Sequence, residues 1–358
     1  TRTRRWMADA DGQGAAPLPR LNLALQGGGS HGALTWGVLD ALLEDGQWQF
    51  DGVSGTSAGA MNAVALAHGF AKAAHDHKDP RDAHQAGCQQ AREALTRLWE
   101  GVGTLGSLMW GVPLAAANPM LGLMSQWLSP YQTNPLDINP LRRLLEREVD
   151  FDLLCAARRT SGGASGPRVF VCATNVRTGR GEIFSGPQLS ADAVMASACL
   201  PLLFKAVEIN GQHYWDGGYS GNPALHPLIY QTETSDILLV QINPIEHVGL
   251  PNSGPEIMER MNEVTFNASL LAEMRAIEFV RRLLAEGKLD ARRYKSVRMH
   301  RIDGGAVLEP FGSDSKTRVD LSFVRQLFAL GRTAGQTWLA AHRADVGVRP
   351  TIRIADNA

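Results

Sequence analysis

The chain has 358 residues, of which 44% are hydrophobic, so it is long enough to bury a large core. Its 35 Lys and Arg residues almost balance its 36 Asp and Glu residues, and the net charge of −1 creates no long-range field that would attract a polyanion. We therefore expect no nucleic-acid partner. The four Cys residues are scattered without a CxxC spacing, which predicts neither a disulfide framework nor a zinc site and favours a cytoplasmic location.

The ends of the chain differ in character from its middle. Residues 1–20 are polar, contain Arg, Gly and Pro, and lack the apolar stretch of a secretory signal, so we expect a flexible N-terminal arm. One main domain is expected over residues 21–345, followed by a C-terminal tail at 346–358. Within this domain, residues 101–136 carry no charged side chain but are interrupted by Pro113, Pro119 and Pro130. A membrane-spanning helix needs ~20 mainly apolar residues in a row, so no span is expected there.

The first two units of the domain each predict a strand, a glycine-rich turn and a helix. Residues 21–25 form an apolar run that ends at three glycines, and residues 33–43 then repeat apolar side chains at helical spacing. Residues 50–54 lead in the same way into a second glycine turn and a run of small residues at 60–67. Two such units imply a parallel sheet covered by helices, so we expect a three-layer α/β/α fold with a mainly parallel central sheet.

Helices and strands also alternate through the rest of the chain. Residues 75–90 are polar and predict a solvated loop that leads into a helix at 91–99. The strongest hairpin signal is Asn210-Gly211, between β-prone arms at 207–209 and 212–215. Further strands are expected at 168–174, 181–184, 236–244 and 297–302, and further helices from 139, at 190–200, 257–287 and 321–342.

The second glycine turn, Gly55-Thr56-Ser57-Ala58-Gly59, matches the G-x-S-x-G nucleophile elbow and lies between a predicted strand and a predicted helix, as an elbow must. Ser57 would be held there in a strained conformation, and side chains at Gly55 and Gly59 would collide with the adjoining strand and helix. The N–H groups of the following helix would face the reacting centre. Ordinary Gly- and Ser-rich turns share this pattern, so the strand-to-helix context carries the interpretation.

The first glycine turn contains Gly27, Gly28, Gly29, Ser30 and Gly32. Their unobstructed N–H groups suit an anion, and as G-x-G-x-x-G the turn also fits a dinucleotide fingerprint. However, no second strand ends in an acidic residue at the usual distance, and no Gly-Lys-Ser/Thr follows. Because the next unit carries an elbow serine, the first four of these residues are better interpreted as an oxyanion hole, and Gly32 as support for the motif.

A third element is Asp216, which ends the second arm of the hairpin and is followed by Gly217 and Gly218. An isolated Asp-Gly pair is more often simply a turn. In combination, the glycine loop, the elbow serine and this late aspartate resemble the patatin-like phospholipase family, in its bacterial type. The resemblance extends to residues 134–140 and 198–201 and covers most of the chain.

This resemblance implies a serine lipid acyl hydrolase, a carboxylic ester hydrolase that works with a Ser-Asp dyad and without a metal or another cofactor. Ser57 would attack the carbonyl and Asp216 would accept its proton. The implied partners are phospholipids, lysophospholipids or other acyl-ester lipids, with peripheral contact to a membrane. An ordinary Asp has a pKa of ~3.9, and desolvation can raise it toward neutrality. Tyr214, Trp215 and Tyr219 flank Asp216; either they form an apolar wall that desolvates it, or they simply pack in the core or at its rim.

His31 stands where many family members have Arg or Lys, which predicts a pH-dependent charge beside the oxyanion loop. Three alternatives remain open at this point. A Ser-Asp-His triad would use His226 or His247. The second alternative is an acyltransferase on the same elbow, although such enzymes generally have a histidine where this chain has Thr56. The third is a lipid-binding module that is catalytically silent. The three histidines in the run at 75–84 are irregularly spaced, so no metal site is expected.

Residues 101–136 have two interpretations of equal weight. Either they form a lid and a wall of the acyl-binding cleft, with Trp110 and Trp127 at a water–lipid boundary, or they are core packed against the sheet.

Overall fold

The computed structural model describes residues 17–110, 139–157, 166–201, 203–246 and 249–353. Its centre is an eight-stranded mixed sheet in the order β5-β6-β3-β2-β1-β7-β8, with β4 paired to β3. Five strands form the parallel part: β1 (Arg20–Leu25), β2 (Gln49–Gly55), β3 (Arg168–Asn175), β7 (Asp236–Gln241) and β8 (Arg298–Asp303). Three add antiparallel pairs: β4 (Gly181–Ser185), β5 (Val207–Ile209) and β6 (Gln212–Asp216).

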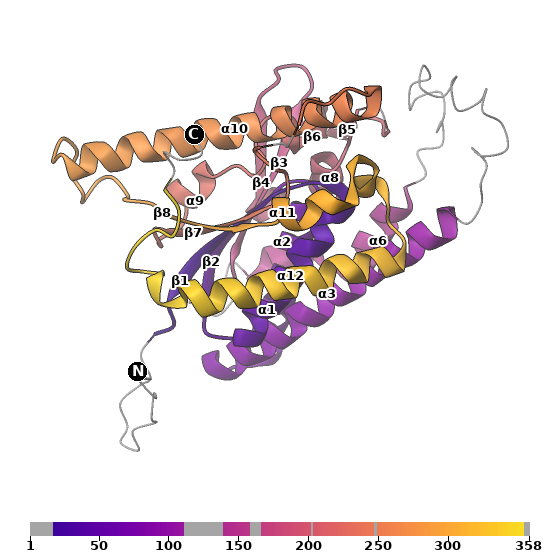
Figure 1. Ribbon diagram of the computed structural model, residues 1–358. Helices are drawn as coiled ribbons and strands as arrows, with labels where there is room; N and C mark the ends of the chain where they lie inside the picture. Colours follow the sequence, from indigo (N-terminus) through magenta and orange to yellow (C-terminus); the bar gives the residue numbers. More distant parts are fainter. Residues whose placement is uncertain (1–16, 111–138, 158–165, 202, 247–248, 354–358) are drawn as a thin grey trace.

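Helices cover both faces of this sheet, as Figure 1 shows. One layer contains α1 (Gly32–Asp45), α2 (Ala58–Asp76), α3 (Pro80–Trp110), α6 (Pro140–Glu148), α7 (Phe151–Ala157), α8 (Ala191–Ser197) and α12 (Leu321–His342). The opposite layer contains α9 (His226–Tyr230) and α10 (Gly254–Ala285). Shorter turns are η1 (Gly29–His31), η2 (Gly186–Gln188), η3 (Gly217–Tyr219), α11 (Gly305–Leu308), η4 (Glu309–Phe311), η5 (Ser313–Thr317) and η6 (Arg343–Asp345). The expected three-layer α/β/α fold is confirmed.

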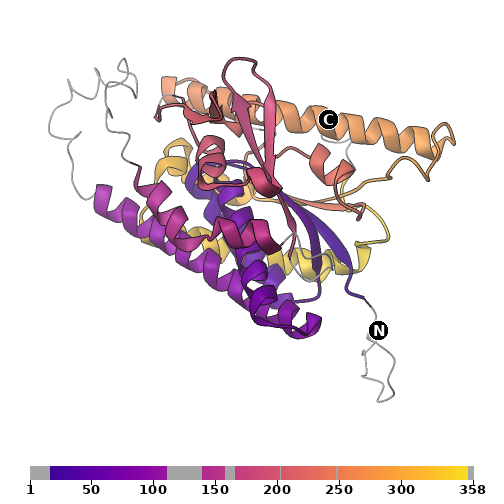
Figure 2. The same cartoon turned by 180° about the vertical axis from the view of Figure 1, so that it is seen from behind.

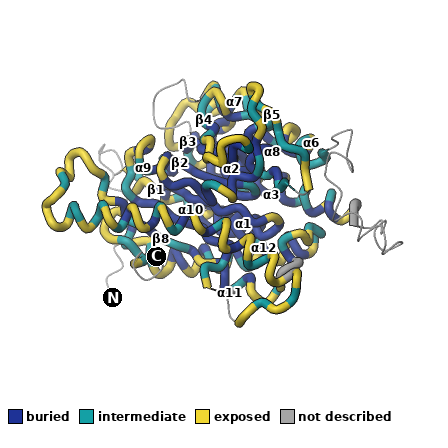
Figure 3. The backbone as a smooth tube through the Cα atoms, turned by 90° about the horizontal axis from the view of Figure 1, so that it is seen from above, coloured by how far each residue is buried: buried dark blue, intermediate teal, exposed yellow. Residues whose placement is uncertain are grey.

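Two hydrophobic clusters lie between these layers, one on each face of the sheet. Neighbouring strand residues alternate between them: Leu238 packs into the cluster with α1, α2, α3 and α12, while Leu239 packs into the cluster with α9 and α10. Because both faces are covered, every residue of β7 is buried, as is usual for strands of a parallel sheet. Figure 3 shows the buried strands and α2 at the centre, with exposed residues around them.

The expected elements are found with one clear difference at residues 75–90. The polar run is not a loop, because α2 continues to Asp76 and α3 begins at Pro80. Small residues form the buried face of this helix: Ala83 and Ala91 are buried, and Gly87 packs against the ring of Phe70. These three residues keep helical spacing, but Ala and Gly contribute little hydrophobicity. The periodic pattern was therefore not recognisable among the surrounding His, Asp and Lys residues. Figure 2 shows α3 as one long helix.

The charge-free segment at 101–136 begins within this same helix. Gly103 and Gly106 lie against Leu321 and Val319, so closely that a Cβ atom would collide at either glycine. Leu105 packs against the hydrophobic core. The described start of the segment is therefore packed against the N-terminus of α12, and its remainder, residues 111–136, lies outside the described residues.

The expected hairpin is present, and the chain beyond the expected domain end at residue 345 still contacts the sheet. Asn210 and Gly211 both have a positive φ, as the two-residue turn between β5 and β6 requires. Beyond residue 345, the Thr351 N–H donates to the Met299 carbonyl of β8 at 3.1 Å. No helix of the described part is both long enough and apolar enough to cross a membrane.

Candidate active site

Ser57 lies at a sharp corner between β2 and α2. Its backbone φ is 55°, a value that residues other than glycine rarely adopt. The glycines on either side are required by close approach. A Cβ atom at Gly55 would lie 2.3 Å from the Gly59 carbonyl oxygen, and one at Gly59 would lie 2.1 Å from the Leu25 carbonyl oxygen. The Ser57 N–H donates to the hydroxyl of Ser197 at 2.9 Å. The elbow geometry expected from the sequence is therefore present.

The glycine loop between β1 and α1 packs directly onto this elbow. A Cβ atom at Gly27 would lie 2.7 Å from the Ser57 Cβ, and one at Gly32 would lie 2.5 Å from the Cβ of Ala58. Gly29 has a φ of 59° and lies against the Lys316 carbonyl oxygen. Side chains at these positions would push the loop away from Ser57, so the glycines allow loop N–H groups to lie beside the nucleophile.

A buried cluster of amide side chains holds the glycine loop in place. The Gly27 N–H donates to Asn222 Oδ1 at 2.7 Å, and Asn243 Nδ2 donates to the Gly27 carbonyl at 2.6 Å. Gln26 links the cluster together, because its Nε2 donates to Asn267 Oδ1 and its Oε1 accepts the Asn243 N–H. The Gly27 N–H is thus already engaged, and of the four expected oxyanion donors only those of Gly28, Gly29 and Ser30 face no partner within the described residues.

Strand register brings Asp216 to the level of Ser57. Gly55 on β2 is opposite Val171 of the parallel neighbour β3, and Asp216 on β6 is opposite Ala173, two residues further along β3. Ser57 is likewise two residues beyond Gly55. Gly217 then permits the chain to turn, since a Cβ atom there would lie 2.0 Å from a carbonyl oxygen of β3. Residues more than 150 positions apart in the sequence are therefore adjacent in the fold.

The Asp216 carboxylate is almost completely buried and faces few donors. The Gly218 N–H donates to its Oδ1 at 2.7 Å, and the Ser57 side chain forms a second hydrogen bond with it. Burial raises the pKa of Asp216 to about 7, and these two hydrogen bonds oppose the shift by favouring the charged form. The carboxylate is therefore adapted to exchange a proton close to neutral pH.

The expected aromatic wall around Asp216 divides into separate contacts. Tyr214 belongs to the core and packs edge-to-face on Phe184, with ring centroids 5.2 Å apart. Tyr219 packs in the same manner on Phe266 of α10 at 5.3 Å, and burial, together with the nearby Asp216, raises the pKa of its phenol. Tyr219 is thus the aromatic residue that shares the environment of the carboxylate.

His31 does not supply the pH-dependent charge expected from the sequence. Its ring is buried, and desolvation, together with the neighbouring Lys316, lowers its pKa to about 3. The imidazole is consequently neutral near physiological pH. Its Nε2 lies 2.7 Å from the Ser315 Oγ, while Ser30 Oγ donates to the Ser315 carbonyl at 2.8 Å. The segment around Ser315 therefore braces the glycine loop from outside.

The other polar residues considered from the sequence lie elsewhere. His226 begins α9 with a half-exposed side chain, and its Nδ1 is 3.9 Å from Glu273. His247 lies outside the described residues. The Thr56 hydroxyl donates to the Gly221 carbonyl at 2.6 Å and so connects the elbow to the chain after Asp216. His84 lies against Phe70, and the described residues contain no group of three side chains placed to hold a metal ion.

Sequence reasoning missed the residues that position the site. Asn222, Asn243, Asn267 and Ser197 occur in no motif, and polar residues of these types are common in loops. Their role follows from burial together with long-range hydrogen bonds, neither of which has a local sequence signal.

The patatin-like phospholipase model matches residues 23–229, which is more than half of the chain and includes the glycine loop, the elbow and Asp216. Among solved structures, the chain is similar to VipD from Legionella pneumophila, with 17% sequence identity and a TM-score of 0.34 over 89% of this chain and 68% of that chain. The comparison with curated proteins gives no match. The family match shows that this chain belongs to the patatin-like phospholipases, which are lipid acyl hydrolases.

Proposed function

We propose that the chain hydrolyses carboxylic esters of phospholipids, lysophospholipids or related lipids with a dyad of Ser57 and Asp216. The observation that carries this proposal is the hydrogen bond between the Ser57 side chain and a buried carboxylate whose pKa is about 7. A base with this pKa is largely unprotonated just above neutral pH and still basic enough to accept the serine proton. No histidine is required in this scheme.

In the acylation step, the Ser57 Oγ attacks the ester carbonyl while its proton passes to Asp216. The carbonyl oxygen becomes an oxyanion, which the N–H groups of Gly28, Gly29 and Ser30 would stabilise. Protonated Asp216 then returns the proton to the leaving alkoxide as the C–O bond breaks.

The first turn of α2 offers one further donor for the oxyanion. Within this turn, the N–H groups of Gly59, Ala60 and Met61 already donate to the carbonyls of Thr56 and Ser57, which leaves Ala58. In the deacylation step, water would attack the acyl-serine while Asp216 accepts its proton; the bond between Ser57 Oγ and the acyl carbon then breaks, the fatty acid leaves, and Asp216 returns the proton to Ser57 Oγ. The same donors would stabilise the second tetrahedral intermediate.

Exposed apolar side chains of η3, which follows Asp216, and of α10 support a lipid substrate and peripheral contact with a membrane. Tyr219 is partly exposed next to Asp216, and Met258 and Met261 of α10 are more than half exposed. Methionine and tyrosine suit the irregular boundary between lipid and water. The four free cysteines support a reducing compartment, so we propose a cytoplasmic enzyme that works at a membrane surface.

The proposal is tested by incubating the protein with a panel of phospholipids, lysophospholipids and neutral acyl esters and identifying released fatty acids by mass spectrometry. Ser57→Ala should abolish release, and Ser296→Ala, at an exposed position just before β8, is the matched serine control. A fluorophosphonate should label the wild-type protein on Ser57. Undiminished hydrolysis by Ser57→Ala, or labelling at another serine, would refute the assignment.

A further inference from the structure

Two consecutive residues of η5 support the glycine loop from its outer side. Ser30 Oγ donates to the Ser315 carbonyl at 2.8 Å and to the Lys316 carbonyl at 3.1 Å. Gly29 packs onto the same Lys316 carbonyl, since a Cβ atom at Gly29 would lie 2.3 Å from its oxygen. The Ser315 hydroxyl lies 2.7 Å from His31 Nε2. Residues 315 and 316 therefore contact every residue from Gly29 to His31.

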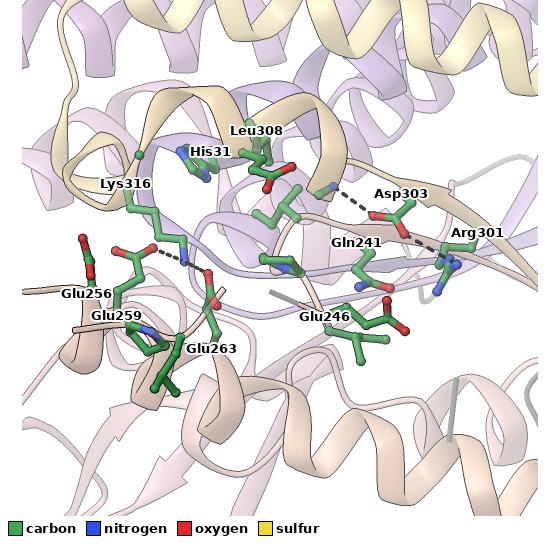
Figure 4. Close-up of a pocket in the computed structure, with 18 of the residues that line it drawn as sticks. His31, Gln241, Glu246, Glu256, Glu259, Glu263, Arg301, Asp303, Leu308 and Lys316 are labelled. Carbon is green, nitrogen blue, oxygen red and sulfur yellow. Dashed lines mark hydrogen bonds and ion pairs between the residues drawn. The ribbon is translucent and has the colours of Figure 1, made fainter. Parts of the chain in front are cut away.

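The Lys316 side chain extends from η5 to α10, as Figure 4 shows. Its Nζ lies 2.8 Å from Glu259 Oε1 and 3.6 Å from Glu263 Oε1. The three side chains are only 20%, 19% and 5% exposed, so salt screens these ion pairs less than it screens pairs on the open surface. They line part of a cavity of about 780 Å³, to which neither Ser57 nor Asp216 contributes. Lys316 thus connects α10 to the glycine loop at a place separate from the dyad.

The same turn of α10 also holds the other outer neighbour of the glycine loop. Arg260 Nη2 donates to the Ile245 carbonyl at 2.9 Å, in the segment that follows β7. Ile242 of this segment packs on Gly28, because a Cβ atom at Gly28 would lie 2.8 Å from Ile242 Cδ1. Residues 259–263 are therefore a common support for both segments that contact the loop from outside.

We propose that Lys316 is a positioning residue for the oxyanion hole. Its ion pairs with α10 hold residues 315 and 316 against the glycine loop, and the loop in turn keeps the N–H groups of Gly29 and Ser30 in place. This inference rests on the proposed hydrolysis, in which these N–H groups stabilise the tetrahedral intermediate. Such donors are effective when they are already placed where the negative charge develops. Lys316 therefore contributes to stabilisation of the transition state and little to binding of the uncharged ester.

Lys316→Met removes the ion pairs and leaves the buried carboxylate with a partner. Methionine keeps most of the apolar stem of lysine. Glu263, the most buried of the three side chains, retains its ion pair with Arg260 at 3.1 Å. Glu259 remains in contact with water. We therefore expect the variant to fold and its glycine loop to be held less firmly.

The test compares turnover with the binding of two inhibitors. With an alkyl trifluoromethyl ketone, the Ser57 Oγ adds to the carbonyl carbon, its proton passes to Asp216, and the carbonyl oxygen becomes an oxyanion that the loop stabilises. The methyl ketone of the same chain length is far less electrophilic and binds without this addition. Lys316→Met should lower kcat roughly tenfold and weaken the trifluoromethyl ketone by a similar factor. KM and the inhibition constant of the methyl ketone should change by less than about twofold.

Further variants separate positioning from a general structural role. Lys316→Arg keeps the positive charge and should retain most of the activity. Glu259→Gln breaks the shorter ion pair from the α10 side and should weaken the trifluoromethyl ketone selectively, as Lys316→Met does. Lys288→Met, which removes an exposed ion pair with Glu286 beyond the end of α10, is the matched control and should behave as wild type. The pH midpoint of kcat/KM should stay near 7 in Lys316→Met, because burial and its own two hydrogen bonds set the pKa of Asp216.

Several results would overturn the inference. Unchanged turnover and unchanged affinity for the trifluoromethyl ketone in both Lys316→Met and Glu259→Gln would show that the ion pairs do not support the loop. Equal weakening of both ketones together with a raised KM would show a distortion of the whole cleft, and a shifted pH midpoint would show an effect on the dyad. If the wild-type protein hydrolyses no ester, the proposed function fails and the positioning role fails with it. If the wild type is active and both variants match it, only the positioning role fails.

Discussion

Replacing Asp216 by Asn should stabilise the protein, and by more as the pH rises. The folded carboxyl has a pKa of about 7, whereas the ordinary pKa of an Asp carboxyl, as in the unfolded chain, is 3.8. Between these values the folded state binds more protons than the unfolded state, so stability falls as pH rises through this window and levels off above about pH 7. Asn is neutral and nearly isosteric. Its Oδ1 can still accept the Gly218 N–H, so the variant removes the cost of burying a charge without opening a cavity.

The expected size follows from the shift. A difference of about three pKa units corresponds to about 4 kcal/mol above pH 7, at ~1.4 kcal/mol per unit. Part of this difference is already present at pH 5, because the unfolded carboxyl is ionised there. The advantage of Asp216→Asn over wild type should therefore grow by roughly 2–3 kcal/mol between pH 5 and pH 8.

Urea unfolding of both proteins at a series of pH values measures this difference directly. Asp76→Asn, at an exposed position, is the control for loss of one carboxylate from the net charge. If the free energies of unfolding of wild type and Asp216→Asn instead differ by a constant amount from pH 5 to pH 8, the pKa of Asp216 is not raised by burial. Its proposed role as a base near neutral pH would then lose its physical basis.

Further outcomes are expected from the same geometry. The rate of ester hydrolysis (kcat/KM) should rise about tenfold per pH unit below about pH 7 and level off above it, because Asp216 must be unprotonated to act as base; a flat profile from pH 5 to pH 8 would contradict this. Asn222→Ala should lower kcat by roughly tenfold with little change in KM, since it removes the acceptor that orients the glycine loop, whereas a change in KM alone would show that it only shapes substrate binding. Gly59→Ala should lower the thermal midpoint strongly because its Cβ has no space, while Gly254→Ala, whose Cβ would meet nothing within 4 Å, should leave it nearly unchanged.

Much of this fold could be predicted from the sequence because its signals are local. Ser57 lies between an apolar run and a run of small residues, and the hairpin is marked by Asn210-Gly211. The environment of Asp216 was harder to predict, because its burial depends on the pairing of β6 with β3 across about 40 residues of sequence. The helical character of residues 80–90 was missed for a different reason, since Ala and Gly form its buried face.

The glycine loop shows where sequence reasoning reaches its limit. Four N–H groups were expected to serve the oxyanion, and the amide cluster uses one of them, that of Gly27, to fix the loop. This bond exists only because Asn222, far away in the sequence, is carried beside the loop by the same turn that follows Asp216. The hydroxyl of Thr56 reinforces that connection by donating to Gly221 from the elbow itself. Nucleophile, base and oxyanion loop are therefore joined through one short segment, residues 216–222. Substitutions at Asp216 and at Asn222 should therefore have non-additive effects on activity, even though Asn243 and the Ser315 segment also hold the glycine loop.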